Sequence, residues 1–127
     1  NVKICKKQIR LLKTLLMLAR PDEQQGKDID FLMALGELFT LVVYGQLVLE
    51  NARIYAVEDD TIDQIFDFMV RDFSKHALQL YSKASSTRNQ MRFCSRMIKK
   101  PAADKARFMR VWENEIYPLK DEYVMQA

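Results

Sequence analysis

The sequence has few of the residues that interrupt helices, with only three glycines and three prolines among 127 residues. So few breakers over this length favour long helices over many short strands. No apolar–polar alternation of strand length competes with the helical period. A chain of this size can also bury an independent core. We therefore expect an all-α fold, with residues 1–127 forming one up-down helical bundle of four to five helices.

The chain is also poor in residues that bind metals or attack substrates. Cys5 and Cys94 lack a CxxC spacing and indicate reduced thiols in a cytoplasmic protein. His76 is the only histidine, so it cannot build a zinc site, and we interpret it as a polar residue at the core edge. No glycine-rich phosphate loop is present. The sequence thus predicts no catalytic residue and no metal ligand, and it leaves any cofactor-binding residue unknown.

The charges are unevenly distributed along the chain. Residues 1–20 carry six cations and no acid, residues 21–72 carry twelve acids and three cations, and residues 73–127 carry eleven cations and five acids. The three segments therefore hold +6, −9 and +6, which sum to the net charge of +3. Opposed patches of this kind do not form the continuous basic stripe of a nucleic-acid-binding protein. No stretch of 18 apolar residues is free of charge, so no membrane-spanning helix is expected.

Apolar residues at three- and four-residue spacings predict five helices, over residues 2–19, 28–56, 61–83, 87–100 and 103–117. The 28–56 helix is apolar nearly all round, which is typical of a buried helix, and we expect it to form the spine of the bundle with the 61–83 helix. Asp28 is its expected N-cap. The last helix should kink or end at Pro118, which lacks a backbone donor.

Two T-x-x-Q patterns predict capping boxes at helix starts, Thr61 with Gln64 and Thr87 with Gln90. Gly36 and Gly45 lie inside the 28–56 helix, where each costs about 1 kcal/mol relative to alanine. Because they face opposite sides, we expect a neighbouring helix to approach closely at each. Leucine at either position should then destabilise the fold by overpacking.

Three charged groups have a possible functional interpretation and a structural one. The acidic cluster lacks the pattern of an EF-hand loop, so favourable interaction with a helix N-terminus explains it better. The charged residues of the 28–56 helix are either a buried general base or, as we favour, an ion pair. The basic stripe could meet a phosphate or an anionic partner, although a solvated helix face is the simpler interpretation. The acidic cluster consists of Glu58, Asp59, Asp60, Asp63 and Asp67. The charged residues of the 28–56 helix are Glu37, Glu50 and Arg53. The basic stripe consists of Arg88, Arg92, Arg96, Lys99 and Lys100.

The 2–19 helix has two possible environments. Its lysines could bind an anionic membrane while its leucines insert, or those leucines could pack on the bundle. The apolar face consists of Leu11, Leu12, Leu15 and Leu16. Burying four leucines stabilises by roughly 6–12 kcal/mol before ordering costs, which exceeds the screened attraction of five cations. We therefore expect packing on the bundle, and peripheral membrane contact is possible but not favoured.

Three segments together resemble the C-terminal helical region of large bacterial acyl-CoA dehydrogenases. They are Gly36–Ala52 (GELFTLVVYGQLVLENA), Ile62–Ser86 (IDQIFDFMVRDFSKHALQLYSKASS) and Arg110–Met125 (RVWENEIYPLKDEYVM), joined through the turn at Lys99, Lys100 and Pro101. The resemblance covers about residues 28–127. It implies a C-terminal fragment of a larger FAD-dependent flavoprotein of fatty acid metabolism, an oxidoreductase that acts on acyl-CoA thioesters.

The family's catalytic glutamate often lies in a Y-E-G-T-like segment, and its flavin is contacted by a Q-x-x-G-G segment. Neither segment occurs here, so no catalytic or FAD-contacting residue is assigned, and the fragment alone is expected to be non-catalytic and to bind no FAD. The resemblance then implies a structural or assembly domain whose partners are the rest of the dehydrogenase chain and, in a homo-oligomer, further copies. The alternatives are a non-enzymatic helical protein-interaction module and the ligand-binding bundle of a transcriptional regulator.

Overall fold

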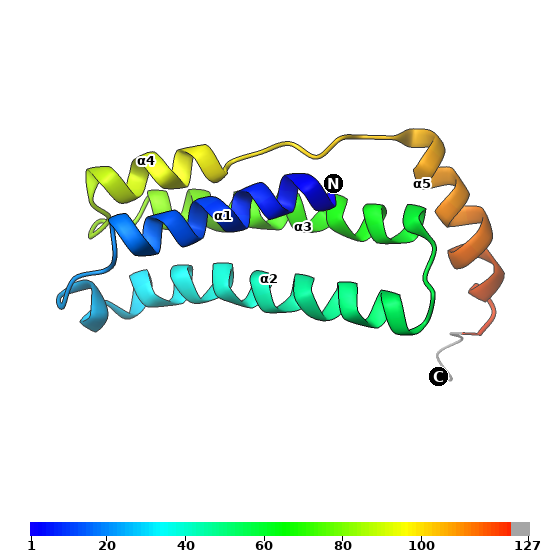
Figure 1. Cartoon of the computed structure of the whole chain (residues 1–127), viewed down its shortest axis with the longest axis horizontal. Coiled ribbons are helices and arrows are strands. Elements are labelled where there is room, and N and C mark those ends of the chain that lie inside the picture. Colours follow the sequence, from blue (N-terminus) through cyan, green and yellow to red (C-terminus); the bar gives the residue numbers. More distant parts are fainter. Residues whose placement is uncertain (123–127) are drawn as a thin grey trace.

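The computed structural model describes residues 1–122, and this part of the chain is helical without any strand. In Figure 1 the molecule is elongated, with a long helix along its lower edge and the last helix across one end. The predicted all-α bundle is confirmed. The helices are α1 (Val2–Leu18), α2 (Ile29–Ile54), α3 (Asp59–Tyr81), α4 (Arg88–Met97) and α5 (Lys105–Val111), with a short 3-10 turn, η1 (Gln25–Lys27), before α2.

Helix α3 lies at the centre of the bundle and contacts α1, α2, α4 and α5. Its inner face is fully buried at Phe73, Ala77 and Leu80. Helix α2, in contrast, packs mainly on α3 and η1, and it forms the lower edge of the molecule in Figure 1. The 61–83 helix is therefore central, as expected. The 28–56 helix is not, because within residues 1–122 the neighbours of α2 lie on one side of it only.

The leucine face of α1 packs into the main core, as expected. Leu12 and Leu15 are buried beside Phe31 of α2 and Phe73 of α3, and Leu11 and Leu16 are partly buried against the same cluster. The leucines cannot enter a membrane while they fill this core. The predicted packing of the 2–19 helix on the bundle is confirmed.

A buried glutamine joins three helices and explains where α4 ends. Gln8 Nε2 donates to the carbonyl oxygens of Val70 and Met97 and to Ser74 Oγ, at 3.2, 2.9 and 3.1 Å. Ser74 Oγ in turn accepts from the backbone N–H of Lys99 at 2.9 Å. The carbonyl of Met97 and the N–H of Lys99 thus have partners outside α4, which they would otherwise find within a longer helix. Helix α4 therefore ends at Met97 and not at residue 100, where Pro101 was expected to stop it.

Two of the three predicted N-caps are confirmed. The Asp28 side chain accepts from the backbone N–H of Phe31 at 3.1 Å, and Thr87 and Gln90 form a reciprocal capping box. The box predicted at Thr61 is wrong. Helix α3 begins two residues earlier, at Asp59, without a side-chain cap, so Thr61 already lies inside its first turn.

The predicted 103–117 helix is α-helical only over Lys105–Val111. It continues as a π-helical turn, Trp112–Ile116, and a 3-10 turn, Tyr117–Leu119, that contains Pro118. A proline cannot donate to the carbonyl four residues earlier, so the regular ladder is lost before it. The Arg110–Met125 segment of the resemblance extends beyond the described residues.

Candidate interaction surface

The side of α2 that faces away from α3 is apolar and exposed. Met33 retains 65% of its accessible surface and Ile54 retains 74%. The other large apolar side chains exposed on this helix are Ile29, Leu32, Phe39, Val43, Tyr44 and Leu47. The expectation that this helix is buried all round is wrong, because no other element within residues 1–122 covers its outer side. By length and composition alone α2 would also suit a membrane span, a property that it shares with core helices of soluble proteins.

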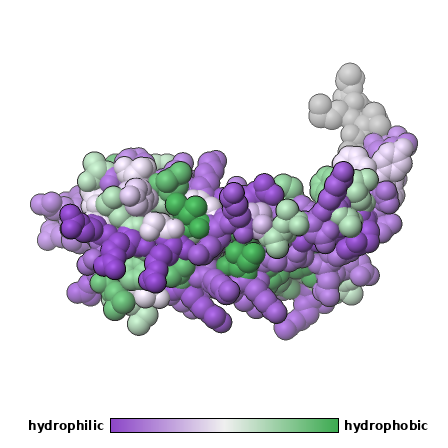
Figure 2. Space-filling view, turned by 90° about the horizontal axis from the view of Figure 1, so that it is seen from above, coloured by the Kyte–Doolittle hydropathy of each residue, from purple (hydrophilic) through white to green (hydrophobic). Residues whose placement is uncertain are grey.

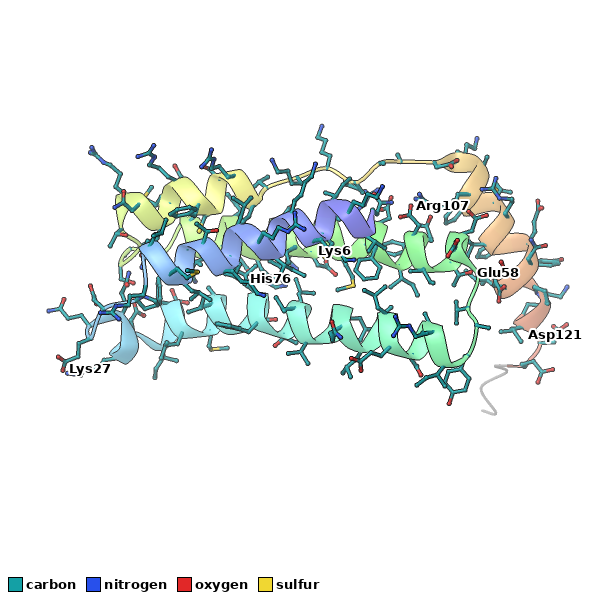
Figure 3. All side chains as sticks on the ribbon, viewed as in Figure 1. Lys6, Lys27, Glu58, His76, Arg107 and Asp121 are labelled. Atoms are coloured by element: carbon teal, nitrogen blue, oxygen red, sulfur yellow. The ribbon has the colours of Figure 1, made fainter. Side chains whose placement is uncertain are left out.

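The charged residues of α2 do not form a buried general base. Glu37 and Glu50 are exposed, and Glu50 accepts from Gln46 Nε2 at 2.7 Å. Glu37 lies 4.0 Å from Nε2 of His76, whose Nδ1 is 2.7 Å from Gln79 Oε1. Figure 3 shows His76 between α3 and α2. Its half-buried place agrees with the polar core-edge residue that the sequence predicts.

The two glycines of α2 differ in their surroundings. A Cβ at Gly45 would lie 3.0 Å from Cε of Met69 on α3, which confirms a close neighbour there. A Cβ at Gly36 would meet nothing within 4 Å. The expected helix crossing at Gly36 is therefore wrong for residues 1–122, because this glycine lies on the outer side of α2.

An open groove of about 440 Å³ separates α1 from α2. Apolar side chains of α2 form one wall, Phe66 of α3 forms part of the floor, and Lys6 and Lys13 of α1 lie along the other wall. Figure 3 shows Lys6 on α1, above α2 in this view, and the exposed residues Val43 and Leu47 of α2 line the groove with it. The groove thus adds apolar surface beside α2, with cations along one side.

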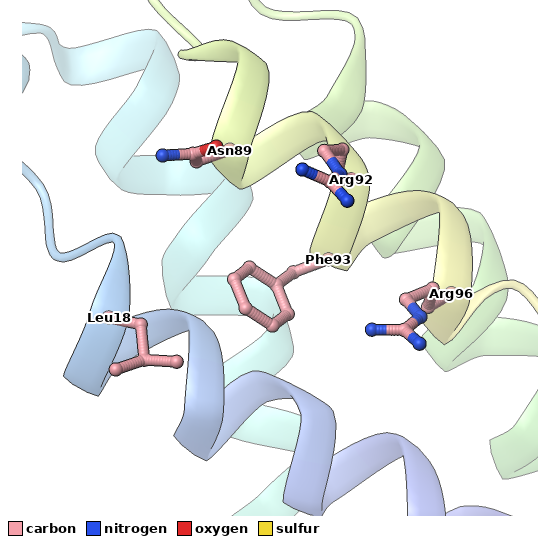
Figure 4. Close-up of a pocket in the computed structure, with 5 residues that line it drawn as sticks. All are labelled: Leu18, Asn89, Arg92, Phe93 and Arg96. Atoms are coloured by element: carbon pink, nitrogen blue, oxygen red, sulfur yellow. The ribbon is translucent and has the colours of Figure 1, made fainter.

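The basic stripe of α4 is exposed along its length, as expected for a solvated face. Arg92 and Arg96 border a shallow hollow of about 270 Å³, together with Asn89, Phe93 and Leu18 (Figure 4). Both guanidinium groups lie at the edge of this hollow, and the polar side chains that line it are all exposed. Figure 2, seen from above, shows mainly hydrophilic side chains on this side of the molecule.

The acidic cluster joins α3 to α5, a role that the sequence analysis missed. Arg107 is 5% exposed and binds Asp63, while its Nη2 lies 3.4 Å from Asp67. Arg110 binds Asp60 through two hydrogen bonds, which lower the pKa of that carboxyl group. Asp59 and Asp60 lie in the first turn of α3, as the helix-terminus interpretation requires. Within residues 1–122 no group of three potential ligands is placed to hold a metal ion.

The two cysteines are fully buried thiols. Burial raises the pKa of Cys5 and of Cys94 from 9.0 to about 11, because a thiolate is poorly solvated in the core. Both side chains are therefore neutral near neutral pH, and neither has the character of a nucleophile.

The chain matches no protein family model, no curated protein and no solved structure. Its function is therefore inferred from its residues and their arrangement. The signal that could have identified the outer face of α2 is present in the sequence, since apolar residues recur at a helical period on two opposite sides of this helix. The sequence analysis took the apolar residues of both faces together as a sign of burial.

Proposed function

We propose that the chain is a helical assembly domain of an FAD-dependent acyl-CoA dehydrogenase that acts on acyl-CoA thioesters. The observation that carries the assembly role is the exposed apolar face of α2, which runs along the whole helix. Exposed apolar side chains that gather on one face, with polar residues at its edges, often mark protein contacts. The dehydrogenase part of the proposal rests on the resemblance of three segments, two of which lie on α2 and α3.

The surroundings of the reactive side chains support a non-catalytic role for this part of the enzyme. The thiols are buried and neutral, His76 is paired at a core edge, and Glu37 and Glu50 are exposed to solvent. Buried, protonated thiols cannot accept a proton near neutral pH, and solvent-exposed carboxylates lack the enclosed place beside a substrate in which a general base works. Catalysis and FAD binding would then belong to the rest of the parent chain, in a cytoplasmic enzyme.

The test is purification of the native protein through an affinity tag at the end of this segment. We expect a mass above 15.0 kDa, bound flavin, and reduction of an electron acceptor that depends on acyl-CoA. The isolated 127-residue chain, as the matched control, should be colourless and inactive. A colourless native protein of 15.0 kDa would contradict the proposal in favour of a stand-alone interaction module. Specific DNA binding by a larger native protein would contradict it in favour of a regulator.

A further inference from the structure

The exposed residues on the outer side of α2 have the spacing of a coiled-coil seam. Eight exposed positions follow one another at alternating spacings of four and three residues: Ile29, Met33, Gly36, Thr40, Val43, Leu47, Glu50 and Ile54. This mean spacing of 3.5 residues keeps a seam facing a second helix along its length. The opposite positions, Phe31, Leu38, Gly45 and Ala52, are all buried in the domain. Helix α2 therefore packs within the chain on one side and presents a seam about 39 Å long on the other.

We infer that this seam pairs with the α2 seam of a second copy of the chain, with the two helices antiparallel. The inference rests on the proposed function, because it names the partner of the assembly surface. In the register centred between Thr40 and Val43, each of these residues faces the other in the second copy. The same register places Ile29 against Ile54, and Met33 against Glu50, at the two ends. Every seam position then has a facing residue, as a two-fold interface requires.

Gly36 supplies the first argument for this register. It faces Leu47 of the second copy, so the absent side chain leaves room for a large one. Apart from the backbone of α2 itself, no atom within residues 1–122 comes within 4 Å of a Cβ at Gly36, so nothing in this part of the chain requires a glycine there. A glycine in a helix interior is unfavourable without such a reason. A crossing helix from a second copy provides it.

The charges supply the second argument and select the orientation. A parallel pair in register would place Glu50 beside Glu50 in the seam, where like charges repel. The antiparallel pair places Glu50 beside Met33 and leaves its carboxylate with Gln46, 2.7 Å away in the same chain. Along the flanks Glu37 comes near Tyr44, and Asp30 comes near Asn51, so no carboxylates meet. Insertion into a membrane would instead carry Glu37 and Glu50 into hydrocarbon, which is strongly unfavourable.

Sedimentation equilibrium of the 127-residue chain tests the pairing. We expect a mass twice that of the 15.0 kDa monomer. Leu47→Glu should weaken self-association by roughly tenfold or more, because it replaces the apolar side chain that fills the space opposite Gly36 with a charged one. Leu78→Glu is the matched control, since Leu78 on α3 is 54% exposed and Leu47 is 56% exposed. A monomeric wild-type chain, or equal effects of the two variants, would overturn the inference.

A second variant keeps the test decisive if Leu47→Glu fails to fold. Gly36→Leu adds bulk only where the single chain has open space, so its circular dichroism should remain helical while its self-association weakens. Unchanged self-association of this folded variant would overturn the register.

Disulfide trapping tests the orientation. An equimolar mixture of Gly36→Cys and Leu47→Cys chains should form a mixed interchain disulfide, while each chain alone should not. Cys5 and Cys94 do not interfere, because both are buried. A disulfide formed by Gly36→Cys chains alone would indicate a parallel pair and overturn the inference.

Failure of the pairing and failure of the proposed function give different results. A monomeric chain within a native, flavin-containing dehydrogenase would overturn the pairing alone. A dimeric chain whose native form is colourless and 15.0 kDa would overturn the proposed function alone. A third outcome is a monomeric wild-type chain that co-sediments with phosphatidylserine vesicles, while Leu47→Glu does not. This outcome would overturn the pairing and identify a membrane surface as the partner of α2.

Discussion

The two sides of α2 carry similar apolar residues in very different surroundings. Phe31 on the inner side is fully buried, while Phe39 on the same helix is 45% exposed. The inner side packs on α3 and η1, whereas no other element within residues 1–122 covers the outer side. An apolar helix surface therefore indicates burial only when something is available to cover it. In this chain one side stabilises the fold and the other is available for assembly.

The largest effect is expected from the two phenylalanines that define this contrast. Phe31→Ala should destabilise the fold by about 3–5 kcal/mol, because it removes a buried ring and leaves a cavity. Phe39→Ala should cost about 1 kcal/mol or less, because its ring is half in solvent already. Chemical denaturation of both variants in a Leu47→Glu background measures the monomer. Equal losses would show that the two sides of α2 do not differ as described.

The ion pairs between α3 and α5 extend the comparison to charged groups. Arg107→Leu should cost about 3 kcal/mol, because it leaves Asp67, which is 4% exposed, with only the partly solvated Arg71 as a cation partner. Arg110→Leu should have little effect, because the Arg110–Asp60 pair is exposed to water. Thermal denaturation of the two variants makes the comparison, and a larger loss for Arg110→Leu would contradict it.

The buried thiols predict how stability depends on alkaline pH. Each thiol has a folded-state pKa of about 11, above its unfolded value of 9.0, so the folded state retains its proton more strongly. This contribution is fully present below pH 9.0 and is lost as the pH rises toward about 11. The loss should be about 1–3 kcal/mol for each thiol. Unfolding free energies of wild type and Cys94→Ala across this range measure it, and the variant should show the shallower decline. Parallel declines would contradict the assigned burial of Cys94.

The glycines of α2 give the smallest expected effect. Gly36→Ala should stabilise the monomer by up to about 1 kcal/mol, because alanine is the better helix former and its Cβ meets no neighbour. Gly45→Ala should gain less, because its Cβ lies 3.0 Å from Cε of Met69, which must move. Melting temperatures in the Leu47→Glu background compare the two sites. A greater rise in melting temperature for Gly45→Ala than for Gly36→Ala would contradict the assignment of Gly45 to the packed side of α2.

Local features of the sequence predict much of this fold. Asp28 and the Thr87–Gln90 pair determine helix starts through contacts within three residues, and the structure has both. The leucines of α1 required only the recognition of one apolar face. The failures involve partners that are distant in the sequence. The end of α4 depends on Gln8 and Ser74, which lie 89 and 25 residues from the groups that they bind. Spacing along one helix carries no information about such contacts.

The same limit applies to the candidate site. Arg107 and Asp63 lie 44 residues apart, so the acidic cluster looked like a helix-terminus signal alone. The exposure of α2 depends on how many neighbours it has, and its apolar composition fits both a core helix and an assembly helix. A core helix and an assembly helix can be told apart only when the residues of α2 are sorted by the helical period into two faces, with Gly45 on one face and Gly36 on the other.

The most direct test of the account compares the oxidation of two methionines in the assembled protein. Met17 on α1 is 80% exposed, and Met33 in the α2 seam is 65% exposed in the single chain. Mild peroxide treatment followed by peptide mass spectrometry should oxidise Met17 readily and leave Met33 protected. In Leu47→Glu the two methionines should react at similar rates. Equal oxidation of Met17 and Met33 in the wild-type protein would contradict the claim that the outer side of α2 is covered by a partner.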